Sequence, residues 1–217
     1  MREYVRDFRM FAGRSAMIGT LWYTLAMTVC FFVFLAVWTF TENEALKGFC
    51  EGFLPMFCLM VPLIGCIPCN MVFNYNRAVT PGYKYFHSLP DSAKRFRRAV
   101  LVCSIYPLGA ALVWAAVLWL WSPMVSLFVL FMGLTLKGAQ NIFGHARNII
   151  LMFLPMMAIV FSMGFVVGFT SPEDENFIYM EMQPKFVLPL AIIGTAVFVI
   201  GTVYSVLVAE KKWNREP

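Results

Sequence analysis

Charged side chains are scarce in this chain, and they are missing from the middle of its apolar stretches. Only 13% of the residues are Asp, Glu, Lys or Arg, whereas 60% are hydrophobic. Soluble domains carry about 25% charged residues, so this composition excludes a soluble domain. Ionisable groups inside a membrane usually mark proton relays or ion sites. Their absence from the apolar stretches leaves the chain without a visible means of driving transport with protons.

Catalytic motifs are equally scarce. The two histidines, His87 and His145, lie in polar intervals, where neither can serve a metal or a catalytic triad at membrane depth. The sequence has no His-Glu-x-x-His, no Gly-x-Ser-x-Gly and no paired glutamates in one apolar stretch, which argues against an intramembrane protease. It also lacks the Gly-x-x-x-x-Gly-Lys-Ser/Thr loop that binds ATP. We therefore expect a chain that is not an enzyme and has no cofactor of its own.

Six apolar stretches fill most of the sequence. Each is long enough to cross a hydrocarbon core about 30 Å thick, which takes roughly 20 helical residues. The stretches are Ala16–Phe40, Gly52–Phe73, Ala99–Trp121, Met124–Phe143, Ile149–Phe169 and Phe186–Val208. Ionisable residues occur only near their edges, such as Glu51 and Lys137. The sequence predicts an all-α integral membrane protein with six transmembrane helices, forming a single transmembrane domain over residues 1–217.

Basic residues sort by side of the membrane. If the N-terminus is inside, 15 of the 17 Lys and Arg residues fall in inner segments, and only Lys47 and Lys185 lie outside. Inner loops rich in Lys and Arg set the topology of membrane proteins. The distribution predicts a multi-pass protein of the cell membrane with both termini cytoplasmic. Because topology accounts for the net charge of +5, we expect no nucleic acid partner.

The first 15 residues have an amphipathic pattern. Apolar residues recur at intervals of three and four, with arginines between them: Met1, Tyr4, Val5, Phe8, Phe11 and Ala12 against Arg2, Arg6 and Arg9. Such a helix lies in the membrane interface with its arginines near anionic lipid, so we expect an interfacial helix over residues 1–15. The alternative is a frayed basic tail that serves orientation only.

Proline and cysteine single out the second stretch. Pro55, Pro62 and Pro68, together with Gly65, predict an irregular helix that lines a cavity, although packing alone explains them equally well. Cys66 and Cys69 are spaced to share a helix face, as a site for a soft metal requires. The alternative is that these thiols pack as small apolar groups, and no further Cys or His stands at ligand spacing.

Two short features mark the ends of the expected spans. Ser122 and Pro123 form a brief outer turn, which predicts that the third and fourth spans pair as an antiparallel hairpin. Tryptophans gather near the ends of spans, as in the aromatic belts of membrane proteins. These residues are Trp38, Trp119 and Trp121 at outer ends and Trp213 just past an inner end. We interpret them as interfacial anchors.

The longest polar interval is the loop Asn74–Arg98, between the second and third spans. It interleaves aromatic and apolar side chains with bases, a pattern typical of a docking surface. We expect the docking residues to be Tyr83, Tyr85, Phe86, Leu89, Pro90, Lys94 and Arg95, with Arg97 and Arg98 also free to pair with acids on a partner. Asp91 and Ser92 are expected to cap a helix that enters the third span. The alternative is a solvated loop that only sets topology.

At these residues the chain resembles a known family. The stretch Phe86-His-Ser-Leu-Pro90, ahead of a basic helix that enters the third span, is similar to the Ser-Leu-Pro element of small ABC-2-type permeases, the membrane subunits of bacterial ABC exporters. The resemblance extends to the length, the six spans and the amphipathic N-terminal helix. After Pro90 the family often has Ile/Val-Ser-Arg and an acid, whereas this chain has Asp91-Ser92-Ala93-Lys94.

The resemblance implies a permease that pairs with a second copy or a paralogue. It implies that residues 74–98 form a coupling loop that docks on a separate cytoplasmic ABC ATPase subunit, and that this partner binds ATP and Mg. It also implies outward transport of an amphipathic substrate such as a peptide, lipid or drug. Two alternatives stay open: a substrate-binding membrane subunit of a vitamin uptake transporter, and an immunity or structural membrane protein without transport activity.

Overall fold

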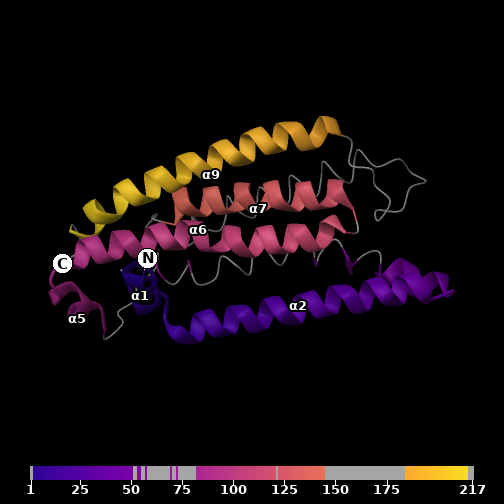
Figure 1. Ribbon diagram of the computed structural model, residues 1–217, viewed down its shortest axis with the longest axis horizontal. Coiled ribbons are helices and arrows are strands. Elements are labelled where there is room, and N and C mark those ends of the chain that lie inside the picture. The colour runs from indigo at the N-terminus through magenta and orange to yellow at the C-terminus, as the bar shows by residue number, and fades with distance from the viewer. Residues whose placement is uncertain are drawn as a thin grey trace.

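The computed structural model describes residues 2–50, 53, 54, 57, 69, 72, 82–120, 122–144 and 184–214. Throughout these ranges the regular secondary structure is helical, which confirms the predicted all-α class. The helices are α1 (Arg2–Ala12), α2 (Arg14–Phe40), α5 (Gly82–Ser88), α6 (Ser92–Trp119), α7 (Pro123–Phe143) and α9 (Pro184–Trp213) (Figure 1).

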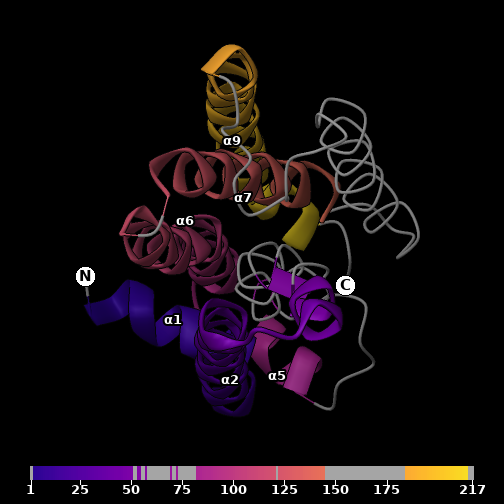
Figure 2. The same ribbon diagram turned by 90° about the vertical axis from the view of Figure 1, so that its right-hand side faces the viewer.

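Four of these helices, α2, α6, α7 and α9, are long and apolar enough to cross a membrane. They coincide with the first, third, fourth and sixth apolar stretches of the sequence. The second and fifth expected spans, residues 52–73 and 149–169, lie largely or wholly outside the described residues. The four long helices stack in the order α9, α7, α6, α2, as the end-on view shows (Figure 2).

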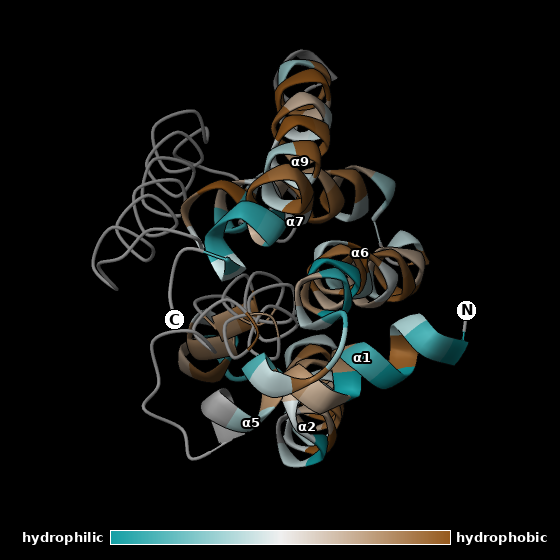
Figure 3. Ribbon diagram, turned by 90° about the vertical axis from the view of Figure 1, so that its left-hand side faces the viewer, coloured by the Kyte–Doolittle hydropathy of each residue, from teal (hydrophilic) through white to brown (hydrophobic). Residues whose placement is uncertain are grey.

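One end of this stack gathers segments that are far apart in the sequence. Helices α1 and α5, the first turns of α6 and the last turn of α9 all lie there (Figure 1). We call it the α5 end. Colouring by hydropathy shows α1 to be largely polar, whereas the long helices are mostly apolar along their length (Figure 3).

The hairpin between α6 and α7 is built by the predicted Ser-Pro turn. Ser122 accepts a hydrogen bond from the backbone N–H of Val125 at 3.4 Å, and so caps α7. Pro123 occupies the first position of the helix, where a missing N–H costs nothing. The hydroxyl of Ser126 donates to the carbonyl of Ala115 at 2.6 Å and ties the two helices together.

Helices α7 and α9 touch through their backbones. A Cβ added at Gly138 would lie 2.6 Å from backbone atoms of Val197 and Phe198, and one at Gly194 would lie 2.7 Å from the carbonyl of Phe131. Only glycine allows this approach, which is typical of helix pairs in membranes. The side-chain amide of Asn141 adds a hydrogen bond of 3.1 Å to the hydroxyl of Thr202.

Helix α2 contributes least to the interior. Of the 18 most apolar consecutive residues of α2, only 11% are buried, compared with 61% of the corresponding residues of α7. Its contact with the stack at the far end runs through a cluster in which Phe31 meets Trp114 edge to face, with ring centroids 5.1 Å apart. Leu118 and Val129 complete the link from α6 and α7.

Candidate functional site

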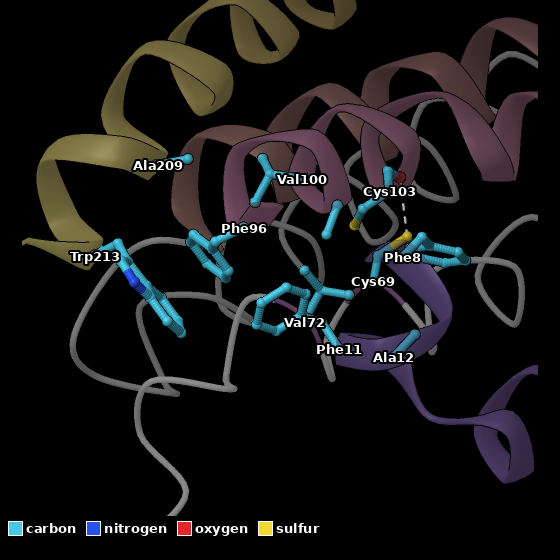
Figure 4. Packing of buried hydrophobic residues seen from close by; sticks show 11 residues of the cluster. Phe8, Phe11, Ala12, Cys69, Val72, Phe96, Val100, Cys103, Ala209 and Trp213 are labelled. Carbon is cyan, nitrogen blue, oxygen red and sulfur yellow. Dashed lines mark hydrogen bonds between the residues drawn. The ribbon is translucent and has the colours of Figure 1, made fainter. Parts of the chain in front are cut away.

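The α5 end is held together by one buried apolar cluster, drawn in Figure 4. Its members come from α1, α6, α9 and the otherwise undescribed interval before α5. They are Phe8, Phe11, Ala12, Cys69, Val72, Phe96, Ala99, Val100, Cys103, Ala209 and Trp213. Phe86 of α5 packs against this cluster from outside. A displacement of α5 would therefore disturb the packing of α1, α6 and α9 in this cluster.

Trp213, at the end of α9, has ring contacts with α5, α6 and α1. It stacks on His87 of α5, with centroids 4.2 Å apart and planes 4° apart, and on Phe96 of α6 at 4.8 Å. Phe11 of α1 meets it edge to face at 5.6 Å. The indole N–H donates to the hydroxyl of Ser92 at 3.0 Å. Trp213 is only 1% exposed, so the expectation that it anchors the chain at the lipid interface is corrected.

The imidazole of His87 shares this enclosure. Burial disfavours its charged form and lowers the pKa of His87 below its usual value. The neutral ring is therefore the form that stacks on Trp213 at neutral pH. From the sequence alone His87 is only a histidine in a polar interval, because the ring on which it stacks is 126 residues further along the chain.

The N-terminal helix is present, as predicted, but its apolar face lies on protein. Phe8 and Phe11 are buried at 1% and 3% exposure, and Phe11 lies 5.7 Å from the ring of Phe86. Tyr4 and Val5, expected on the same apolar face, are exposed at 39% and 41%. A location of α1 in the membrane interface remains a prediction.

Ion pairs hold α1 and α9 on the first turns of α6. Arg98 lies 2.6 Å from Glu3 and 3.0 Å from Asp7, whose side chain is fully buried. Arg97 pairs with Glu210 of α9 at 2.8 Å. The sequence predicts that Arg97 and Arg98 can pair with acids on a partner. In the structure both are engaged within the chain.

The expected docking residues divide into an outward set and an inward set. Tyr85 is 63% exposed, and Pro90 and Lys94 are also exposed. Leu89 and Arg95 are partly buried, and Phe86 lies against the cluster described above. Tyr83 lies in α5. Tyr85 is therefore the aromatic docking residue whose ring the structure places outward.

The helix after the docking loop begins where the sequence predicts, but by another mechanism. α6 starts at Ser92, and Asp91 stands at its N-cap position with φ 57° and no side-chain capping bond. The Asp91 carboxylate instead lies 3.3 Å from the ammonium of Lys94. Pro90 and this left-handed residue together make the sharp turn from α5 into α6.

A second polar site lies inside the stack, at Lys137 of α7. Its ammonium donates to Oε1 of Gln140 at 2.5 Å and lies 3.9 Å from the sulfur of Cys103. Lys137 is only 2% exposed. The sequence predicts that Lys137 is one of the charges that set topology, because it stands near the end of an apolar stretch. Its burial indicates a structural or functional role in addition.

Proline explains why a thiol joins this site. Pro107 of α6 has no N–H, so the carbonyl of Cys103 four residues earlier loses its helical partner. The thiol of Cys69 donates to that carbonyl at 3.0 Å (Figure 4). Cys69 and Cys103 are each 0% exposed. A cavity of about 10 Å³ lies between α6, α7 and α9 and is lined in part by Pro107, Lys137 and Phe198.

The remaining sequence candidates fall in the second span. Pro55, Pro62, Gly65 and Pro68, the expected cavity-lining residues, lie outside the described residues, as does Cys66. Within the described part of the chain no group of three or more His, Cys, Asp or Glu side chains is arranged to hold a metal ion.

Replacing Trp213 with phenylalanine tests the attachment of α5. The smaller ring keeps most of the apolar contact but removes the hydrogen bond to Ser92, at a cost of about 1 kcal/mol. We expect faster proteolytic cleavage between α5 and α6 in the purified protein, with unchanged membrane abundance. Trp22→Phe, on the exposed face of α2 at 67% exposure, is the matched control and should cleave at the original rate.

No known protein-family model matches the chain, and neither the curated proteins nor the solved structures include one with significant similarity.

Proposed function

We propose that this chain is the membrane subunit of an ATP-driven exporter and receives force from a separate ATPase through α5. The observation that supports this role is that α5 and the turn after it have one side exposed and one side packed against the rest of the chain. Tyr85 and Pro90 are turned outward, while Phe86 and His87 pack into the cluster that joins α1, α6 and α9. A subunit without a motor of its own needs such a rigid contact between its surface and its spans.

The layout of the described helices supports the proposal. α2 and α6 run away from the α5 end, whereas α7 and α9 run toward it (Figure 1). α2 therefore ends opposite the start of α5, and α7 ends opposite the start of α9. This is the arrangement expected if the second and fifth apolar stretches each cross the membrane once, giving six spans with the α5 end in the cytoplasm.

The proposal assigns the energy source and the partners. ATP and Mg are bound by a cytoplasmic ABC ATPase, and a second permease copy or a paralogue completes the transport path. An apolar lining suits an amphipathic cargo such as a peptide, lipid or drug-like molecule, moved outward. The resemblance at Phe86–Pro90 to ABC-2-type permeases is consistent with this assignment.

Tyr85→Asp tests the docking surface. An exposed aromatic at the centre of a protein contact commonly contributes about 2 kcal/mol, which corresponds to roughly 30-fold in affinity. We therefore expect a tagged Tyr85→Asp chain, purified from its native membranes, to lose at least nine tenths of the Mg-dependent ATPase activity that elutes with the unaltered chain.

The matched control is Leu46→Asp. Leu46 is 42% exposed and lies at the opposite end of the stack, where no ATPase contact is expected. The control should retain the eluting activity, and both variants should reach normal abundance because neither side chain is buried. Equal ATPase recovery with Tyr85→Asp and the unaltered chain would show that α5 is not the docking surface.

A further inference from the structure

One face of α1 carries arginines and is turned away from the buried cluster. Phe8 and Phe11 hold the opposite side of the helix in that cluster. The arginine face borders an open hollow of about 520 Å³, which is lined by four exposed side chains spaced at three and four residues: Arg2, Val5, Arg6 and Arg9. The proposed docking of an ATPase on α5 makes no use of this face.

The charge of this face has little compensation within the protein. Among the described residues no acidic side chain pairs with Arg2 or Arg9, and Arg6 reaches only Asp7, at 4.0 Å. The two acids of α1 lie closer to Arg98 of α6, at 2.6 and 3.0 Å. These ion pairs and the buried phenylalanines fix α1 on α6, so the arginine face is presented to its surroundings as a positive surface.

Helix α1 lies where the exposed apolar surface of α2 begins. It runs crosswise to the long helices, because it is seen nearly end on beside the start of α2 in Figure 1 and along its length in Figure 2. Its N-terminal end projects past α2 at the side of the stack (Figure 2). The exposed apolar side chains of α2 start one turn after the junction, with Ile18, Leu21 and Trp22. In a membrane, a helix in this position lies at the boundary between headgroups and acyl chains.

We propose that the arginine face of α1 binds the phosphate of an anionic phospholipid whose acyl chains lie along α2. Guanidinium groups donate paired, charge-assisted hydrogen bonds to phosphate oxygens, and the hollow has the volume of a small-molecule site. Val5 supplies an apolar contact among the arginines. A soluble anion would make the first of these contacts but not the contact with α2, so the arrangement favours a lipid. The lipid would connect α1 and α2 on the two sides of Gly13.

The test uses the purified full chain in detergent, titrated with phosphatidylglycerol or with phosphatidylcholine of the same acyl chains, while native mass spectrometry counts the lipids that stay bound. We expect the first phosphatidylglycerol to bind at least about tenfold more tightly than phosphatidylcholine. In Arg2→Gln/Arg9→Gln this preference should fall to about threefold or less, because each arginine near an anionic headgroup contributes about fivefold in affinity. Both arginines are exposed, so without lipid the variant should unfold at the same SDS concentration as the unaltered chain.

The matched control is Lys94→Gln/Lys211→Gln, which removes the same charge from exposed side chains at the α5 end and should keep the full preference. Equal losses in the two double variants would show that net charge alone attracts the lipid, and equal affinity of the unaltered chain for both lipids would also overturn the proposal. Glycerol 3-phosphate, which has the phosphate but no acyl chains, should not displace phosphatidylglycerol at equal concentration. Displacement would assign the arginine face to a soluble anion instead. The assay contains no ATP and no partner, so its outcome is independent of the exporter proposal.

Discussion

An alanine at Gly138 should lower the free energy of unfolding by about 3 kcal/mol, at the upper end of the cost of overpacking an interior. The added methyl group would meet the backbone of Val197 and Phe198 at 2.6 Å. A backbone cannot rotate out of the way as a side chain can, so α7 and α9 must separate. The measurement is SDS-induced unfolding of the purified protein in mixed micelles.

Gly109→Ala is the control for this substitution. Gly109 lies within α6, and a Cβ there has nothing within 4 Å. Because alanine is a better helix former than glycine, the control should be as stable as the original chain or more stable by up to about 1 kcal/mol. If Gly138→Ala matched Gly109→Ala, close backbone contact between α7 and α9 would be ruled out.

Removing the charge of Arg98 should cost about 3–5 kcal/mol, the usual penalty for leaving a buried partner charge uncompensated. In Arg98→Met the carboxylate of Asp7, 0% exposed, loses the guanidinium 3.0 Å away and keeps only the more distant Arg6, at 4.0 Å. We expect α1 to detach from α6. The detachment is measured as increased maleimide labelling of a cysteine introduced at Ala12, which is 4% exposed in the intact protein.

Two further variants distinguish the effect of an unpaired buried charge from a general loss of stability. Asp7→Asn combined with Arg98→Met leaves no buried charge unpaired, because Glu3, the other partner of Arg98, is 65% exposed, and the double variant should recover a large part of the lost stability. Arg97→Met removes the pair with Glu210, whose side chains are 52% and 35% exposed, and should cost at most about 1 kcal/mol. Equal losses for Arg97→Met and Arg98→Met would contradict the special role of Asp7.

The sequence predicted the parts of the fold that depend on local pattern. Apolar runs of about 20 residues defined α2, α6, α7 and α9 because a membrane requires helices of that length. The Ser122-Pro123 pair predicted the α6–α7 hairpin, since both residues favour helix starts. The amphipathic period of the first residues predicted α1. In each case the signal lay within a few turns of the element concerned.

The site was less predictable because its contacts are distant in sequence. The sequence suggests that Trp213 is an interfacial anchor and that His87 is a loop residue. Their contact becomes visible only in the folded chain, where the two rings stack. The sequence suggests that Lys137 is a charge at the edge of a span, because hydropathy does not show which face of α7 is covered by other helices. One signal was available: a proline frees the carbonyl four residues before it, so Pro107 marked Cys103 as a position that needs a donor from elsewhere.

In a membrane, the exposed apolar surface of α2 would meet lipid rather than protein. Its apolar part, Met17–Phe40, is about 36 Å long at 1.5 Å per residue, some 6 Å more than a typical hydrocarbon core. In a bilayer a helix with so few protein neighbours accommodates this excess by tilting, so its angle follows lipid thickness. Gly13, with φ 77°, separates α1 from α2, and we expect that tilt to be taken up there. The angle between α1 and α2 would thus differ between thinner and thicker bilayers, while α1 keeps its contacts with α6.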